Sequence, residues 1–283
     1  MEKDIKQEVR QFYDRVGWSK KADGVYQNAR YEDLRPVSSE YIHRCHLRVN
    51  RHLKKGGRFL LDAGSGPIQY PEYLTYSETY QKRVCLDISM VALQEARQRI
   101  GDHGLFVVAD VANLPFKSEV FDGVVSLHTL HHLPLQDQSR AYGDLYRVLA
   151  PGSSMVIVNG WTDSPLMRRT AGMVNLAERV KGRLVRRSQQ QDIVLEKKVE
   201  KKPVEPTGTF IQKQNADWLR SELDGKMKYE IRVWRSVNMR FLRALIHTRL
   251  AGRAWLRLLF WLEERYPNYF GEKGQYPLVV VYK

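Results

Sequence analysis

Residues 60–67 read LLDAGSGP, an apolar run that leads directly into two glycines. The run has the length and apolarity of a buried parallel strand. Glycines after it allow a tight turn, in which the backbone can approach a ligand without a Cβ in the way. Because ligands of open α/β sheets bind beyond the carboxyl ends of the strands, this stretch predicts a strand and one wall of a ligand site.

Six further short apolar runs, each of a length suited to a strand, occur along the chain at 83–87, 105–109, 121–127, 155–159, 229–237 and 278–282. Helical patterns such as 90–100 and 136–149 separate the earlier runs, which indicates parallel strands joined by right-handed crossovers. With the first strand, placed at 58–63, the runs predict an α/β fold. It is a seven-stranded, mostly parallel, Rossmann-like open sheet with helices on both faces.

The parts around this sheet differ in composition. We predict an N-terminal helical cap at 1–55, a ligand-binding core at 56–160, a basic and partly mobile insertion or lid at 161–214, and a C-terminal part at 215–283 that completes the sheet. The cap contains helical patterns over 2–16 and 38–55. Residues 182–209 are polar and charge-rich, which is typical of a mobile segment. Residues 240–265 have an apolar helical pattern that contains several arginines.

Composition excludes several classes of protein. The 283 residues carry 46 Lys and Arg against 32 Asp and Glu, and residues 161–283 hold 25 and 13 of these, so nearly all of the excess lies there. Two cysteines, Cys45 and Cys85, cannot make a disulfide scaffold, and no Cys/His spacing suggests a metal site. No signal peptide is evident, and no apolar run approaches the roughly 18 residues of a membrane span. We expect a soluble protein in the reducing cytoplasm.

Two acids follow the glycines at intervals that suit a nucleoside. Asp87 ends the second predicted strand, 21 residues after Gly66, where a carboxylate can take both hydroxyls of a ribose. Asp110 ends the third strand, where it can meet the exocyclic amine of an adenine between the apolar faces of Ile88 and Val111. Each acid taken singly has a plainer interpretation. At the second strand this is a cap of the following helix, a role for Asp87 or Ser89, and at the third it is a turn aspartate for Asp110.

The glycine pattern further limits the kinds of ligand that the site could bind. A dinucleotide site usually has a third glycine where Gln69 stands, and Pro67 follows Gly66 directly. No Gly-Lys-Ser/Thr follows, which removes the P-loop interpretation. The pattern favours a single nucleoside with a smaller tail, faced by the amides of a following helix start.

A resemblance to class I S-adenosylmethionine-dependent methyltransferases, of the type 11 and quinone-biosynthesis group, is carried by five ordered segments. They are LLDAGSG (60–66), CLDIS (85–89), VVADVANLPF (107–116), FDGVVSLHTLHHL (121–133) and LYRVLAPGSSMVIV (145–158). The resemblance covers residues 56–160. It implies S-adenosyl-L-methionine as cofactor and an enzyme that moves a methyl group by in-line displacement. The substrates of this group are diverse, and for this chain we expect a small-molecule acceptor, whether a metabolite, a lipid-like compound or a natural product.

The resemblance also implies which residues bind the cofactor. They are Tyr13, Asp62, Gly64, Ser65, Gly66, Asp87, Ile88, Asp110, Val111, Ser126, Leu127 and His128. Asp62 and the glycines would line the methionine part, Asp87 would take the ribose, and Tyr13 would cover the cofactor from the N-terminal helix. A half-buried tyrosine of an amphipathic helix is the plainer interpretation of Tyr13. Ile68 departs from the family pattern, which has a small residue there.

Three histidines, His128, His131 and His132, follow the fourth predicted strand on the cofactor side. Histidine suits proton removal near neutral pH, so we take His131 as the first candidate for a general base, with His128 and His132 as alternatives. Packing at a helix start is the plainer interpretation. In-line transfer needs chiefly alignment and exclusion of water, so we expect no nucleophilic residue and no metal.

The stretch 240–262 interleaves arginines with leucine, phenylalanine and tryptophan. It predicts either a peripheral membrane contact or a cover over the sheet or substrate pocket with solvated arginines. Nucleic acid is a less favoured partner, because no RNA-binding module is evident. The alternatives to a small-molecule enzyme are a non-catalytic protein of the same fold that binds a membrane surface or a partner, and an RNA methyltransferase. The acceptor atom and the oligomeric state stay open.

Overall fold

The computed structural model describes residues 5–20, 24, 26–189 and 208–283. In this part of the chain, seven strands form one sheet in the order β3-β2-β1-β4-β5-β7-β6. The strands are β1 (Gly57–Ala63), β2 (Tyr80–Asp87), β3 (Gly104–Val108), β4 (Phe121–Leu127), β5 (Leu149–Val158), β6 (Lys228–Arg235) and β7 (Tyr276–Tyr282). The predicted seven-stranded Rossmann-like fold is confirmed. β7 runs antiparallel to both of its neighbours, β5 and β6.

The order of the strands reverses at β1, which pairs with β2 on one side and with β4 on the other. The first five strands are parallel, so their carboxyl ends share one edge of the sheet. Since β7 is antiparallel, its first residue, Tyr276, lies at this same edge, opposite Arg235 at the end of β6. A reversal of this kind creates a crevice in which open α/β sheets bind their ligands.

Helices cover both faces of the sheet because its strands are apolar on both sides. Leu61 packs in a core cluster with residues of α4 (Leu135–Val148) and α6 (Ala216–Leu223). Its neighbour Leu60 points the other way and packs in a second cluster with α3 (Met90–Ile100) and the 3-10 turn Pro71–Ser77. These two layers hold the carboxyl edge in place.

The predicted N-terminal helices are present and shorter than expected. α1 (Ile5–Phe12) passes into a π-helical turn, Tyr13–Gly17, and α2 (Ser39–His46) passes into a 3-10 turn, Leu47–Arg51. The π turn is closed by the Trp18 amide, which donates to the Tyr13 carbonyl oxygen at 2.9 Å. Single π turns are frequent at functional sites, and this one turns Tyr13 and Trp18 toward the sheet edge.

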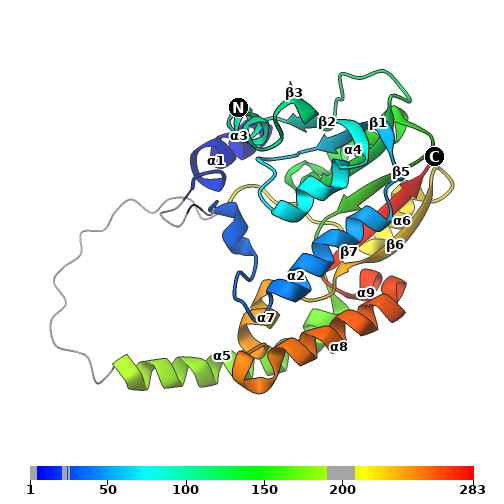
Figure 1. Cartoon of the computed structure of the whole chain (residues 1–283). Coiled ribbons are helices and arrows are strands. Elements are labelled where there is room, and N and C mark those ends of the chain that lie inside the picture. The colour runs from blue at the N-terminus through cyan, green and yellow to red at the C-terminus, as the bar shows by residue number, and fades with distance from the viewer. Residues whose placement is uncertain (1–4, 21–23, 25, 190–207) are drawn as a thin grey trace.

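The structure differs from the prediction after β5. Residues 182–189, expected in a mobile segment, belong to the 25-residue helix α5 (Pro165–Gln189), and the rest of that segment up to residue 207 lies outside the described residues. The stretch 240–265 is not one helix: it forms α7 (Met239–Leu245) and α8 (Gly252–Arg265), separated by a turn in which Ala251 adopts a φ of 54°. The last helix, α9 (Pro267–Lys273), packs on β6. Figure 1 shows α5, α7 and α8 grouped along the side away from α1 and α3.

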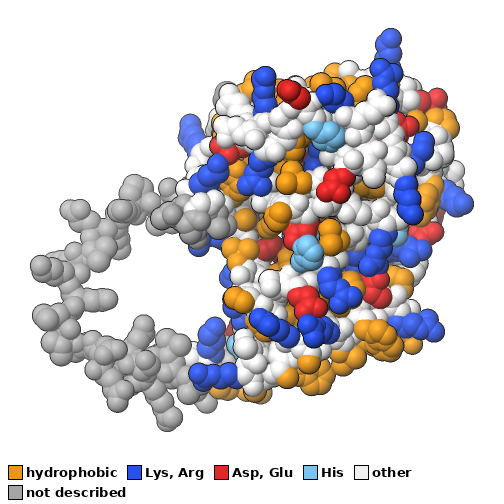
Figure 2. Space-filling model, viewed as in Figure 1, with side chains coloured by type: hydrophobic (Ala, Val, Ile, Leu, Met, Phe, Trp, Pro, Cys, Tyr) orange, Lys and Arg blue, Asp and Glu red, His pale blue; other side chains and the backbone are white. Residues whose placement is uncertain are grey.

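The outer face of α8 is apolar. Trp255, Leu258 and Trp261 are 61%, 45% and 59% exposed, while Leu256 and Phe260 on the opposite face are buried. Figure 2 shows hydrophobic and basic side chains interspersed along the edge where Figure 1 draws this helix. The predicted peripheral membrane contact through 240–262 stays a prediction. Within the described residues, no helix has the length and apolarity that a membrane span requires.

Candidate active site at the carboxyl edge of the sheet

A cavity of about 340 Å³ lies over the carboxyl edge of the sheet. Pockets of roughly 300–1,000 Å³ are typical of small-molecule sites. The predicted site residues that line it are Tyr13, Asp62, Gly64, Ser65, Gly66, Asp87, Ile88, Asp110, Val111, Leu127, His128, His131 and His132. The fold therefore brings residues from four strand ends and from the N-terminal segment around one space.

Ser126 is the predicted site residue that does not line this cavity. Its side chain is fully buried, and its hydroxyl donates to the carbonyl oxygen of Ala63 at 2.8 Å. Leu127 ends β4 and His128 follows it, and both line the cavity, whereas Ser126 lies one residue further back within the strand. The structure thus places Ser126 in a hydrogen bond between β4 and β1, and its predicted cofactor contact stays a prediction.

The glycine loop needs glycine at two positions. Gly64 and Gly66 have φ angles of 78° and 53°, which disfavour residues with a Cβ. A Cβ on Gly64 would lie 2.2 Å from Thr129, and one on Gly66 would lie 2.9 Å from the Trp18 ring. The loop therefore packs between β4 and the N-terminal segment, with its backbone against the cavity.

The backbone amides of this loop are used differently from the prediction. The Gly64 and Ser65 amides both donate to the Leu86 carbonyl oxygen, at 2.7 and 3.1 Å, so they join β1 to β2 and do not face a ligand. No α-helix starts at this loop; the next element is the 3-10 turn Pro71–Ser77. The expectation of a helix start that presents its amides to the ligand is wrong, because Pro67 and a φ of 53° at Ile68 redirect the chain.

Ile68 is a β-branched residue in a left-handed conformation, which is a rare and strained state. Its side chain is completely buried in the cluster on the α3 face. Its carbonyl oxygen accepts a hydrogen bond from Arg99 at 2.7 Å. Burial and this hydrogen bond stabilise Ile68 in its left-handed conformation. The family pattern has a small side chain at this position.

Asp87 anchors the centre of the site. Its carboxylate accepts hydrogen bonds from the amides of Gly66 and Ser89, both at 2.9 Å. Burial raises the pKa of Asp87 to about 6, although the two amide hydrogen bonds oppose the rise. The cap of α3 is Ser89, whose hydroxyl accepts from the Ala92 amide, so the plainer interpretation of Asp87 as that cap does not hold.

Asp110 lies at the β3 end of the cavity with Ile88 and Val111. One of its oxygens is 2.5 Å from the Lys6 ammonium group, and the other accepts from the Ala112 amide at 2.9 Å. The contact with the Ala112 amide is that of a turn aspartate, as in the plainer interpretation. Asp110 also lines the cavity, as the ligand-binding interpretation requires. Its predicted contact with adenine stays a prediction.

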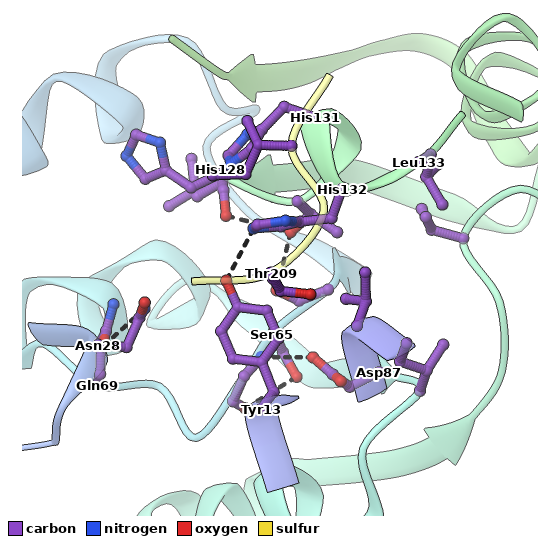
Figure 3. A pocket seen from close by; sticks show the side chains of 18 of the residues that line it. Tyr13, Asn28, Ser65, Gln69, Asp87, His128, His131, His132, Leu133 and Thr209 are labelled. Carbon is purple, nitrogen blue, oxygen red and sulfur yellow. Dashed lines mark hydrogen bonds between the residues drawn. The ribbon is translucent and has the colours of Figure 1, made fainter. Parts of the chain in front are cut away.

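Tyr13 reaches across the cavity from the π turn (Figure 3). Its hydroxyl is 2.8 Å from His132 Nε2, and its ring stacks on Trp18 with 4.8 Å between centroids. His132 Nδ1 lies 2.8 Å from the carbonyl oxygen of Phe210, which can only accept. Nδ1 therefore carries the proton, Nε2 accepts from Tyr13, and both ring nitrogens of His132 are used.

The other two histidines are buried in different surroundings. His131 donates from Nδ1 to the Asn159 side-chain oxygen at 3.0 Å, and burial holds its pKa well below the usual value. His128 has a φ of 56° and packs against the Trp234 ring, and burial lowers its pKa to about 3. All three rings are neutral near pH 7, and His131 keeps one nitrogen, Nε2, with no hydrogen bond among the described residues.

Comparison with known proteins identifies the core. Residues 61–157 match the family model of a methyltransferase domain. This part of the chain is a class I, S-adenosylmethionine-dependent methyltransferase domain. Among solved structures, the methyltransferase domain and its surroundings are similar to phosphoethanolamine N-methyltransferase 2 of Haemonchus contortus in complex with S-adenosyl-L-methionine. That similarity has a TM-score of 0.53 and 17% identity, and covers 97% of this chain and 59% of the other.

Two curated relatives illustrate the range of the family. A probable tRNA methyltransferase 9B of Homo sapiens is 28% identical over 130 residues, which is 45% of this chain and 27% of the relative. The ubiquinone/menaquinone biosynthesis C-methyltransferase UbiE of Bordetella parapertussis is 29% identical over 136 residues, 46% of this chain and 52% of the relative. The chain thus spans about half, or less, of the length of these relatives.

The cofactor of the methyltransferase domain is S-adenosylmethionine, and the residues at the carboxyl edge fit it. Asp87 offers a carboxylate at the end of β2, and the apolar side chains of Ile88 and Val111 flank Asp110 at the next strand. The backbone at Gly64 and Gly66 leaves no room for a Cβ. These groups would hold the ribose, the adenine and the methionine part respectively.

Several residues of the cavity were missed by sequence reasoning, namely Lys6, Trp18, Glu32, Lys213, Trp234, Arg235 and Tyr276. They come from the N-terminal segment, from the chain before α6, and from β6 and β7. The five family segments contain none of them. The fold alone places them, since no spacing along the chain relates Lys213 to a strand end.

The raised pKa of Asp87 predicts how cofactor binding depends on pH. Ribose hydroxyls donate to the ionised carboxylate, and below pH 6 this group is protonated in the free protein. At pH 5, one unit below this pKa, only about one tenth of the carboxyl groups are ionised. We therefore expect S-adenosylhomocysteine to bind about tenfold more weakly at pH 5 than at pH 7. Calorimetric titrations at pH 5, 6 and 7 measure this. Asp87→Asn should show a flat profile, and a flat profile in the unchanged protein would contradict the assignment.

Proposed function

We propose that the protein transfers the methyl group of S-adenosylmethionine to a small-molecule acceptor by in-line displacement. The observation that carries the proposal is the cavity itself, which joins Asp87 and the glycine loop to the three histidines. The bound cofactor supplies a reactive methyl group on a sulfonium. The protein's part is to align the acceptor and to exclude water, and Tyr13 and Trp18 cover the cavity for this purpose.

His131 is the residue we assign to proton removal when the acceptor is a hydroxyl or a protonated amine. Asn159 holds its Nδ1–H, so the tautomer presents Nε2 as a proton acceptor. Its lowered pKa keeps the ring neutral, which is the form that can take a proton, and also makes it a weaker base than a free imidazole. His132 is less suited to this role because Tyr13 and the Phe210 carbonyl oxygen occupy both of its nitrogens.

The experiment that tests the function follows a labelled methyl group. The purified protein is incubated with methyl-labelled S-adenosylmethionine together with a metabolite extract and, in a separate reaction, together with total tRNA. We expect label in the small-molecule fraction. His131→Ala should lower turnover about 100-fold, within the range for a lost general base, while S-adenosylhomocysteine affinity stays unchanged. Normal turnover of this variant would eliminate His131 as the base.

Two other outcomes would favour the alternative functions. Label in the tRNA fraction would support an RNA acceptor, which the basic composition and the tRNA methyltransferase relative keep as the second candidate. Binding of S-adenosylmethionine without labelled product in any fraction would support a non-catalytic protein of the same fold.

A further inference from the structure

The half of the cavity beyond β4 has its own chemistry. It is formed by the ends of β4, β5 and β6 and the start of β7, on the far side of β4 from Asp87 and the glycine loop. The rings of His128, Trp234 and Tyr276 meet there edge to face, with centroid distances of 4.9, 5.7 and 5.8 Å. This end of the cavity therefore presents flat aromatic walls.

Lys213 contributes a cation to the same region. A Cβ on Gly160, just past β5, would lie 3.3 Å from both Lys213 Nζ and Tyr276 Cε1, so the ammonium group and this ring flank one backbone position. The side chain is half-buried, and burial lowers its pKa. No carboxylate among the described residues forms an ion pair with it. A cation removed from water without a counterion is costly, so a bound ligand is expected to supply the missing charge.

Among the polar groups of the lining residues that have no hydrogen-bond partner in the described part of the chain, two donors come from β6. They are the indole Nε1–H of Trp234 and the Nε–H of Arg235, both buried. Glu32 neutralises the charge of Arg235 and accepts hydrogen bonds from its NH1 group. The Nε–H group of Arg235 has no acceptor in the ranges that the structure describes. Buried donors are normally satisfied, so an acceptor that approaches these two side chains would gain hydrogen bonds that the described residues do not supply.

We propose that the acceptor substrate is a flat, largely apolar molecule that carries an acidic group, and that Lys213 binds this group. This inference rests on the proposed function and names its substrate class. The acidic group is a carboxylate or a phosphate ester, since either matches an ammonium group and neighbouring N–H donors. The aromatic rings of His128, Trp234 and Tyr276 hold the body of the molecule against the methyl donor.

The test compares acids with their neutral counterparts on protein saturated with S-adenosylhomocysteine. The probes are benzoate against benzamide, 2-naphthoate against 2-naphthamide, and phenyl phosphate, with dissociation constants measured by saturation-transfer NMR. We expect at least one acid to bind about tenfold more tightly than its neutral counterpart, as for one charged hydrogen bond. Lys213→Met should abolish that difference and Lys213→Arg should keep it. Lys117→Met, which removes an exposed lysine away from the cavity, should leave it unchanged.

The outcomes separate this inference from the proposed function. Equal binding of acids and neutral probes, absence of binding by every acid, or a difference that survives in Lys213→Met would overturn it. A loss of S-adenosylhomocysteine affinity in Lys213→Met would overturn it as well, because Lys213 would then bind the cofactor's own carboxylate. If the unchanged protein does not bind S-adenosylhomocysteine, this result contradicts the proposed methyltransferase function as well as the proposed acid-binding site.

Discussion

Asp87→Ala is expected to abolish binding of S-adenosylhomocysteine while the protein stays folded. The carboxylate would accept both ribose hydroxyls, and hydrogen bonds to a charged group contribute about 1.5–3 kcal/mol each. Their loss predicts at least a 100-fold weaker affinity. Asp87 also orders the loop through the Gly66 amide, so the variant removes both the ribose contact and the support of the loop.

The fold should tolerate this change for an electrostatic reason. Burial raises the pKa of Asp87 above that of an unfolded chain, so its ionised form contributes no stability at pH 7. Circular dichroism should therefore show an unchanged fold, while the melting temperature should fall modestly because the amides of Gly66 and Ser89 lose their acceptor. Calorimetry then measures the affinity, and Asp217→Ala, in an exposed turn of α6, is the matched control. Affinity that persists in Asp87→Ala would remove the ribose assignment.

Glu32→Ala is expected to destabilise the protein by about 3–5 kcal/mol, the range for breaking a buried ion pair. Both Glu32 oxygens bind Arg235 NH1, at 2.5 and 2.7 Å, and both side chains are buried. Burial alone would raise the pKa of Glu32, but Arg235 and His46 outweigh it and lower the pKa to about 2. The pair is therefore fully ionised at pH 7, and its contribution is lost only as the pH falls from about 4.5 toward 2.

The same chain offers a control with equal charge. Glu40 pairs with Arg257 at 2.9 Å on the surface, where an ion pair contributes about 0–1 kcal/mol. Urea denaturation of Glu32→Ala and Glu40→Ala measures the two losses side by side. Similar losses would show that the Glu32–Arg235 pair does not hold the N-terminal segment on the sheet.

Much of the fold and the cofactor half of the site follows from sequence reasoning. The apolar runs predicted all seven strands, because buried parallel strands must be apolar on both faces. Gly64, Gly66, Asp87 and Asp110 were found because each lies at the end of a strand or within three residues after it, and parallel strands bring their carboxyl ends to one edge. The use of the loop amides was not predictable, since it depends on the path that Pro67 and Ile68 impose on the chain.

The break between α7 and α8 also escaped prediction. The periodicity of the apolar residues continues across it, while the turn depends on the His247 carbonyl oxygen, which accepts from the amides of Leu250 and Gly252. The same limit applies to α5, where a polar sequence forms a long helix. Patterns indicate which residues are apolar and do not show which neighbour will bury them.

The sequence by itself determined the strands, the order of strands and helices along the chain, and the strand-end residues of the cavity, since these depend on local periodicity and on residues next to strand ends. Only the tertiary structure decided the other end of the cavity, where we propose that the acceptor binds. Lys213, Trp234 and Tyr276 meet because β7 runs antiparallel between β5 and β6, which returns distant parts of the chain to the carboxyl edge. Contacts of this kind depend on long-range pairing, and no spacing within one segment encodes them.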